Sequence, residues 1–406
     1  MSAVVVFIIF AICLVIAIPI SISLGIVAVL PGAFDASFTA SAGYVIRSMV
    51  GGIDSFPLLA VPMFVLAGIL MAHGKISEKL FDVFVYFLGN KRAGIPCAVI
   101  ITCLFYGAIS GSAPATVAPV GSMTIPLLIE LGYEKDFSTA IVAVAGGLGV
   151  IIPPSIPFIM YAMATGESVS DLFLAGIVPG MMISALLIFY AYYYCRRHGE
   201  DREKIQAKMD QLKAKGFVNI LKESIWALLS PVIVLGCIYS GVASPTEAAV
   251  ISVFYSLFVS LFIYKSIKVK QIWGIMVEAM KTYAPILFIL ATSTAFSRVL
   301  TLMQVPQDVS AWIMTHFSNE IVLLLVINVV LLIVGMVMDT TPAILILSPI
   351  LLPIVEHVGM NPIHFGVMMI VNLAVGFVTP PVGVNLFVAS SLTNVPMMQI
   401  AKMPKM

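Results

Sequence analysis

The chain has 406 residues, of which 61% are hydrophobic and only 10% are charged. Soluble domains carry roughly a quarter charged residues, so this composition excludes an ordinary soluble protein. It predicts an all-α polytopic membrane protein, because helices satisfy their own backbone hydrogen bonds in lipid. The net charge of +1 argues against a nucleic-acid partner.

The first apolar run covers residues 3–30 and lacks the basic leader of a cleaved signal peptide. We expect it to stay in the mature protein, within an N-terminal scaffold segment at 1–54. Pro19 either kinks one long span or separates two short ones. Two spans would place Met1 outside the membrane, and one span would place it inside.

The apolar segments that follow predict full spans at residues 55–73, 172–195, 224–239, 246–264 and 283–303. Amphipathic segments follow the first and the last of them, at 76–88 and at 309–317, where Phe317 is the last residue. Such segments usually lie at the membrane interface, so we expect them to form arms. Ser244 and Glu247 have the spacing of a helix capping box, which gives Glu247 a structural role.

Residues 107–154 and 335–381 read as two copies of one design. Each has an apolar helix, a small polar tip, an apolar return and a second helix broken at a double proline. Gly107 corresponds to Gly335, and one small gap aligns the double prolines. We expect a re-entrant hairpin and a broken helix in each copy. Paired interruptions of this kind indicate a substrate and ion site in a transporter.

The basic residues orient the chain. Threaded in this way, every lysine and arginine except Arg47 and Arg298 falls on one face, including Lys405. The positive-inside rule makes that face cytoplasmic. The first hairpin, at 93–133, then enters from the cytoplasm, and the second, at 319–362, enters from outside. The two copies are therefore predicted to be inverted repeats.

The breaks and tips supply the candidate ligands. Pro153-Pro154 and Pro380-Pro381 each remove two backbone donors, which frees carbonyls that can coordinate sodium. The tips add hydroxyl groups and helix N-termini, which suit an anionic substrate. A double proline is often only a kink, and Ser110-Gly111-Ser112 is a possible helix contact. The occurrence of four breaks in two matched copies favours a site.

Charged residues at membrane depth are costly and usually face a cavity. Asp339, at the second tip, either binds a cation or caps the helix that opens at Thr341-Pro342. Arg298 either binds an anion or reaches the outer interface from the end of its span. Arg47 is expected on the outer surface.

Short phrases of the chain resemble the large membrane subunit of tripartite ATP-independent periplasmic (TRAP) transporters. They are FPLLAVP at 56–62, SGSA at 110–113, DTTPAI at 339–344, NPIHFG at 361–366 and TPPVG at 379–383. The resemblance runs from about residue 50 to the end. It implies a sodium-driven importer of organic acids, such as C4-dicarboxylates or sialic acid, in the bacterial inner membrane. It also implies two partners, a small four-helix membrane subunit and a soluble periplasmic binding protein.

The resemblance implies an elevator-type mechanism, in which a transport domain slides against a scaffold. The implied transport domain is 93–171 and 319–394, and the implied scaffold is 1–54, 55–92 and 172–318, with a C-terminal segment at 395–406. The implied sodium ligands are Ser110, Gly111, Ser112, Gly149, Ile152, Pro153, Asp339, Thr340, Thr341, Gly376 and Thr379. The implied substrate ligands are Ser112, Pro154, Arg298, Thr341 and Pro380.

Two departures from the family pattern carry expectations of their own. The small subunit is not fused to the start of this sequence, so it is expected as a separate chain. Members of the family continue into one more apolar helix, so a further helix is expected beyond Met406.

Other functions remain open. A stand-alone sodium–dicarboxylate symporter shares the hairpins and the inverted repeats but needs no binding protein. An intramembrane enzyme would need a nucleophile or metal set that the sequence does not show, and a channel would not need matched broken helices. Neighbouring genes for a small membrane protein and a binding protein would favour the importer.

Overall fold

The computed structural model describes residues 2–35, 38–214, 216–316 and 319–403, so Phe317, Lys405 and Met406 lie outside the described residues. Regular structure in this part of the chain is helical throughout, which confirms the predicted all-α class. Eight of its helical segments are long and apolar enough to cross a membrane.

The helices are α1 (Ala3–Val15), α2 (Ile20–Phe34), α3 (Ala42–Ile53), η1 (Phe56–Leu59), α4 (Ala60–His73), α5 (Ile76–Leu88), α6 (Gly94–Ser110), α7 (Ala113–Glu130), α8 (Lys135–Gly146), α9 (Leu148–Ile151), α10 (Ile156–Thr165), α11 (Val169–His198), α12 (Arg202–Ala214), α13 (Phe217–Tyr239), α14 (Pro245–Phe258), η2 (Val259–Ile263), α15 (Val269–Leu302), α16 (Val305–His316), α17 (Glu320–Val337), α18 (Thr340–His357), α19 (Pro362–Gly376), α20 (Val384–Thr393) and α21 (Met397–Lys402).

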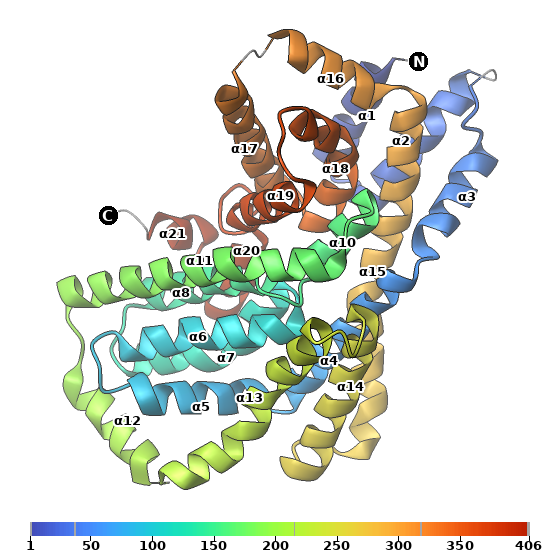
Figure 1. Cartoon of the computed structure of the whole chain (residues 1–406). Coiled ribbons are helices and arrows are strands. Elements are labelled where there is room, and N and C mark those ends of the chain that lie inside the picture. The colour runs from blue at the N-terminus through green and yellow to red at the C-terminus, as the bar shows by residue number, and fades with distance from the viewer. Residues whose placement is uncertain (1, 36–37, 215, 317–318, 404–406) are drawn as a thin grey trace.

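A frame of helices α2, α3, α4, α14 and α15 runs along one side of the molecule (Figure 1). Its axis is α15, which packs on α2, α3 and α4. With 34 residues, α15 is about 50 Å long and exceeds the hydrocarbon core of roughly 30 Å. The sequence predicted this helix only from residue 283 onward, because the lysines in its earlier turns are typical of a loop.

The first hairpin consists of α6 and α7, which pack on each other and on α8 (Figure 1). The amphipathic helix α5 lies against α6 and reaches the frame through α13. The long helix α11 lies across α6, α9 and α19, so it contacts both broken helices. The sequence placed this helix in a scaffold segment, and the domain boundaries stay predictions.

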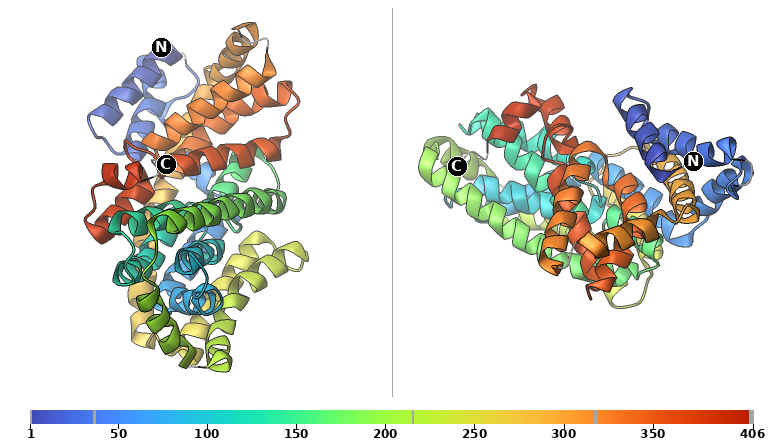
Figure 2. Two further views of the ribbon diagram at one scale, coloured as in Figure 1. Left: turned by 90° about the vertical axis from the view of Figure 1, so that its left-hand side faces the viewer. Right: turned by 90° about the horizontal axis from the view of Figure 1, so that it is seen from above.

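The second hairpin consists of α17 and α18, and it packs with α19 and α10. The helix α16 comes directly before this hairpin in the chain and contacts α18 and α15. It corresponds in chain order to α5, which comes directly before α6 of the first hairpin. We call α6–α9 with α20 the first hairpin group, and α10 with α17–α19 the second hairpin group. Seen from above, the N-terminal helices and the first hairpin group lie at opposite ends of the molecule, with the second hairpin group between them (Figure 2). The first hairpin meets the frame at α4, and the second meets it at α15.

Local signals account for several helix boundaries. The chain separates at Pro19 into α1 and α2, which pack against each other, so one continuous N-terminal span is excluded. The predicted capping box is confirmed, since the Glu247 amide donates to Ser244 Oγ and the Ser244 amide donates to Glu247 Oε2. Glu247 is thus explained by the helix start.

A buried carboxylate ties the base of the first hairpin to the loop after α11. Glu200, whose side chain is 2% exposed, accepts hydrogen bonds from the Tyr133 hydroxyl at 2.7 Å and from the Ala93 amide at 3.0 Å. Arg202 pairs with its second oxygen at 2.8 Å. Burial and the bond to Glu200 raise the pKa of Tyr133, so its hydroxyl stays protonated as the donor.

The predicted inversion of the two hairpins has a direct test. The starting chain has its five cysteines replaced by alanine or serine. In that chain, Lys135→Cys places a thiol just after the first hairpin, and Glu320→Cys places one at the start of the second. Both positions are exposed. We expect an impermeant thiol reagent to label Cys at 135 only from the cytoplasmic side and Cys at 320 only from outside. Labelling of both positions from one face would contradict the inversion.

Candidate functional site

The first hairpin turns at a glycine that no other residue replaces well. α6 ends at Ser110, and Gly111 follows with φ +63°, a left-handed conformation that favours glycine. A Cβ on Gly111 would lie 3.0 Å from the carbonyl oxygen of Pro154. The Gly111 carbonyl accepts a hydrogen bond from the Ile156 amide at 3.1 Å. The tip is thereby joined to the second half of its broken helix.

The first break lies between α9 and α10, and its residues are buried. The peptide bond between Pro153 and Pro154 is cis. Ser155 Oγ donates to the Val150 carbonyl at 2.6 Å and accepts from the Phe158 amide, so it caps α10. The buried polar groups of the break are therefore hydrogen-bonded, as irregular backbone at membrane depth requires.

Hydroxyl and carbonyl oxygens converge between tip and break. Ser110 Oγ lies 2.9 Å from Thr116 Oγ1, and Thr116 donates to the Ser112 carbonyl at 2.8 Å. A Cβ on Gly149 would lie 2.5 Å from Thr116 Oγ1 and 2.8 Å from the Ser112 oxygen. Such oxygens are the ligands that hard cations prefer. Sequence reasoning missed Thr116, although it lies one helical turn after Ser112.

The second tip carries the charge of the site. Asp339 stands at the N-cap position of α18, but its side chain makes no capping hydrogen bond to the helix. Instead Asp339 Oδ1 accepts a bond from the Thr340 hydroxyl at 3.0 Å. Asp339 is exposed, whereas Thr340 and Thr341 are buried. Of the two roles left open for Asp339, capping of α18 is thus not supported by a side-chain hydrogen bond, and cation binding stays a prediction.

The second break spans the residues between α19 and α20. The peptide bond between Pro380 and Pro381 is cis, and Thr379 Oγ1 donates to the Val375 carbonyl at 2.8 Å. The Val382 amide donates to the Met336 carbonyl at 3.2 Å, which joins this break to its own hairpin. Each hairpin is therefore hydrogen-bonded to the break that follows it, the first through its tip and the second through the last turn of α17.

Two glycine pairs occupy matching places in the two copies. A Cβ on Gly107 would lie 2.6 Å from the Cα of Gly149, and a Cβ on Gly376 would lie 2.6 Å from the Cα of Gly335. In each copy the hairpin's first helix and the broken helix thus approach backbone to backbone. Only glycine permits this distance.

The two tips meet at one small cavity of about 50 Å³. Its lining combines Gly111 and Ser112 from the first tip, Asp339, Thr340 and Thr341 from the second, and Ile286 from α15. At 10–15 Å³ for each water, such a space holds roughly four waters, and it is too small for an organic acid without widening. Val150 and Phe377 of its lining belong to a buried apolar cluster with Ala113, Ile151 and Ala374.

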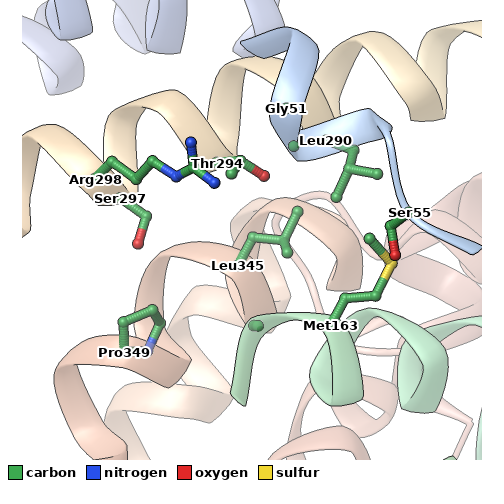
Figure 3. A pocket seen from close by; sticks show the side chains of 11 residues that line it. Gly51, Ser55, Met163, Leu290, Thr294, Ser297, Arg298, Leu345 and Pro349 are labelled. Carbon is green, nitrogen blue, oxygen red and sulfur yellow. The ribbon is translucent and has the colours of Figure 1, made fainter. Parts of the chain in front are cut away.

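The other predicted residues divide into two groups. The first group does not line the cavity and consists of Ser110 at the end of α6 and of residues in the breaks or in the last helical turn before them, namely Gly149, Ile152, Pro153, Pro154, Gly376, Thr379 and Pro380. Arg298 is placed elsewhere, in a separate cavity between α15, α3, α10 and α18 (Figure 3). The structure therefore does not bring Arg298 together with the tips.

Asn385 is a further polar residue that no sequence pattern singles out. It is fully buried in α20, and its Nδ2 donates to the Ala143 carbonyl of α8 at 3.0 Å. Its Oδ1 has no hydrogen-bond partner among the described residues. Asn385 thus links the two broken helices directly.

Comparison with known proteins places these features in a family. The family described as "Tripartite ATP-independent periplasmic transporter, DctM component" matches residues 7–404. The isethionate TRAP transporter permease protein DctMQ of Oleidesulfovibrio alaskensis is 43% identical over 393 residues, which are 97% of this chain and 61% of that protein. The chain thus spans less than two thirds of that relative.

A second relative is covered more fully. The C4-dicarboxylate TRAP transporter large permease protein DctM of Pseudomonas aeruginosa is 40% identical over 344 residues, 85% of this chain and 79% of that protein. Among solved structures, the YdaH transporter of Alcanivorax borkumensis aligns with a TM-score of 0.61 at 14% identity, over 90% of this chain and 85% of that one. At that identity the likeness concerns the fold.

Proposed function

The chain belongs to the DctM component family of tripartite ATP-independent periplasmic transporters, and from this we propose that it is the membrane subunit of a sodium-coupled importer of small organic acids. It is a multi-pass membrane protein of a transporter family, in agreement with the predicted location in the bacterial inner membrane. The observation that carries the proposal is the cavity where both hairpin tips meet.

The chemistry of that cavity suits sodium together with an anion. The N-termini of α7, α10 and α18 all border it, through Ser112 and Pro114, Ile156 and Pro157, and Thr340 and Thr341. Each N-terminus carries about half a positive charge, which favours a carboxylate or sulfonate. The Asp339 carboxylate favours a cation in the cavity, and the hydroxyl groups of Ser110 and Thr116, which lie beside the first tip but do not line the cavity, add further oxygens.

The names of the relatives suggest the substrate class. One is named for isethionate, a two-carbon sulfonate, and another for C4-dicarboxylates. Both are small anions, and we propose the same class for this chain. Sialic acid, which the sequence resemblance also implies, stays a prediction. It serves as the comparison substrate in the uptake experiment below.

We further propose the elevator mechanism and the two partners implied by the family. Where the frame touches the first tip, Gly68 of α4 faces Ser110, and a Cβ there would lie 3.3 Å from Ser110 Cα. Tyr106 donates to the Gly68 carbonyl at 2.9 Å. A contact in which a glycine faces the backbone of a serine is compatible with sliding of the hairpin groups along the frame.

Reconstituted uptake tests the proposal. Proteoliposomes would contain this chain and its small membrane subunit, with an inward sodium gradient and labelled succinate, isethionate or sialic acid outside. We expect accumulation of succinate or isethionate only when sodium and the binding protein are both present. Uptake without the binding protein would favour the stand-alone symporter. Equal uptake with and without the sodium gradient would contradict sodium coupling.

A further inference from the structure

An apolar groove of about 580 Å³ lies between α6 and α11. Cys97 and Ile101 line it from α6, and Ala185, Phe189 and Tyr192 line it from α11. The lining residues of each helix are three or four positions apart, so each set lies on one helix face. The groove is larger than the cavity at the tips and shares no lining residue with it.

One end of the groove lies near the water–lipid boundary. α6 and α11 lie side by side and run in opposite directions (Figure 1). Gly94, the first residue of α6, lines the groove together with Tyr192, which lies in the last two turns of α11. α11 is a candidate membrane span whose last turn is basic, as is typical of a span that ends at the boundary. Ile101 and Ala185 line the other end, which at about 1.5 Å per residue lies roughly 10 Å deeper.

Two basic residues stand at the boundary end. Lys91 and Arg92 line the groove from the turn that joins α5 to α6, and both are exposed. Neither makes an ion pair or a side-chain hydrogen bond with any described residue. No acidic residue is among the described residues that line the groove. The groove is therefore positively charged at the boundary and apolar along the rest of its length.

The turn that carries the basic pair is held in place by its backbone. The Gly94 amide donates to the Lys91 carbonyl at 3.0 Å, and the Ala93 amide donates to Glu200 Oε1 at 3.0 Å. A Cβ on Gly94 would lie 1.9 Å from the Leu88 carbonyl oxygen, so only glycine lets the turn fold back on α5. Glu200 is buried and has a basic partner of its own, so it does not neutralise the exposed pair.

We propose that this groove binds an anionic phospholipid, with an acyl chain between α6 and α11 and the headgroup phosphate on Lys91 and Arg92. The apolar walls suit an acyl chain, and a basic pocket between membrane helices suits an anionic headgroup. A zwitterionic lipid carries the same phosphate, but its ammonium group cancels the net charge. The site should therefore prefer phosphatidylglycerol to phosphatidylcholine, whichever substrate the chain transports.

Native mass spectrometry of the full chain in detergent measures this preference. Phosphatidylglycerol and phosphatidylcholine with the same acyl chains are added at equal, increasing concentrations. We expect the preference for phosphatidylglycerol to fall roughly tenfold to thirtyfold in the double variant Lys91→Gln/Arg92→Gln, because two cations near a lipid surface account for a change of that size. The matched control is Lys268→Gln/Lys270→Gln, which removes the same charge from exposed residues outside the groove and should keep the preference.

Cys97 reports binding in the groove itself. A chain that keeps only this native cysteine is placed in nanodiscs and treated with N-ethylmaleimide. We expect slower modification in phosphatidylglycerol than in phosphatidylcholine, and no such difference in Lys91→Gln/Arg92→Gln. Cys237 of α13 is half-buried like Cys97 and lies outside the groove, so a chain that keeps only Cys237 should react equally in both lipids. Glycerol phosphate, which has the phosphate but no acyl chain, should not slow the reaction of Cys97.

A variant that fills the groove tests the acyl-chain part of the site. Ala185→Phe adds an aromatic ring to the groove wall and should remove the difference between the two lipids at Cys97. Leu186→Phe adds the same ring at the next, exposed position of α11, which does not line the groove, and should keep the difference. Thermal unfolding of each variant shows whether it keeps its fold.

Several results would overturn the site. Equal rates at Cys97 in the two lipids, an unchanged preference in Lys91→Gln/Arg92→Gln, or an equal loss in Lys268→Gln/Lys270→Gln would each do so. Slowing by glycerol phosphate would indicate a site for free anions. Protection of Cys97 in phosphatidylcholine on addition of the proposed small membrane subunit would assign the groove to that subunit instead.

Discussion

Asp339→Asn is expected to raise the sodium concentration needed for half-maximal uptake by tenfold or more. Asparagine keeps the shape and one oxygen but removes the negative charge beside Thr340. Two unit charges about 4 Å apart attract by about 4 kcal/mol at an effective dielectric of 20. Asp339 is exposed, so screening reduces this value, and a tenfold change is the conservative expectation.

Initial uptake rates at a series of external sodium concentrations measure this effect. Glu320→Gln is the matched control, because Glu320 is an exposed carboxylate at the start of the same hairpin and does not line the tip cavity. It should leave the sodium curve unchanged. A wild-type sodium curve in Asp339→Asn would remove Asp339 from the ion site.

Gly149→Ala is expected to abolish most sodium-dependent uptake through a single methyl group. The new Cβ would lie 2.5 Å from Thr116 Oγ1 and 2.8 Å from the Ser112 carbonyl oxygen, so both oxygens must shift. Overpacking of this kind costs about 1–3 kcal/mol of stability. It would also displace the oxygens that we assign to the ion.

Thermal unfolding of the purified chain measures the loss of stability, and uptake measures the effect of displacing the proposed ion ligands. Gly236→Ala is the control, since a Cβ at that position in α13 meets no atom within 4 Å. A helical glycine replaced by alanine in open space gains about 0.5–1 kcal/mol, so this variant should transport normally. Normal uptake in Gly149→Ala would contradict the close approach of tip and break.

Local sequence patterns predicted much of the fold. The observed bounds of α5 are those of the predicted arm at Ile76–Leu88, and the second hairpin helix starts at Thr340 beside the predicted tip. These features depend on neighbours within one or two turns, such as glycine at a left-handed position or proline at a break. The start of α15 was predicted too late, because lysines in a helix outside the bilayer resemble a loop.

The sequence by itself determined that the chain is a helical membrane protein and that its hairpin tips and double prolines are special. Only the tertiary structure decided which of these residues meet. It joined Ser112 to Asp339 across one cavity, added Thr116 and Asn385, and placed Arg298 in a separate cavity. The physical reason is that apolar helices carry similar surfaces, so composition does not specify their partners. Partners are chosen by packing, where glycines such as Gly107 and Gly376 permit contacts that larger residues prevent.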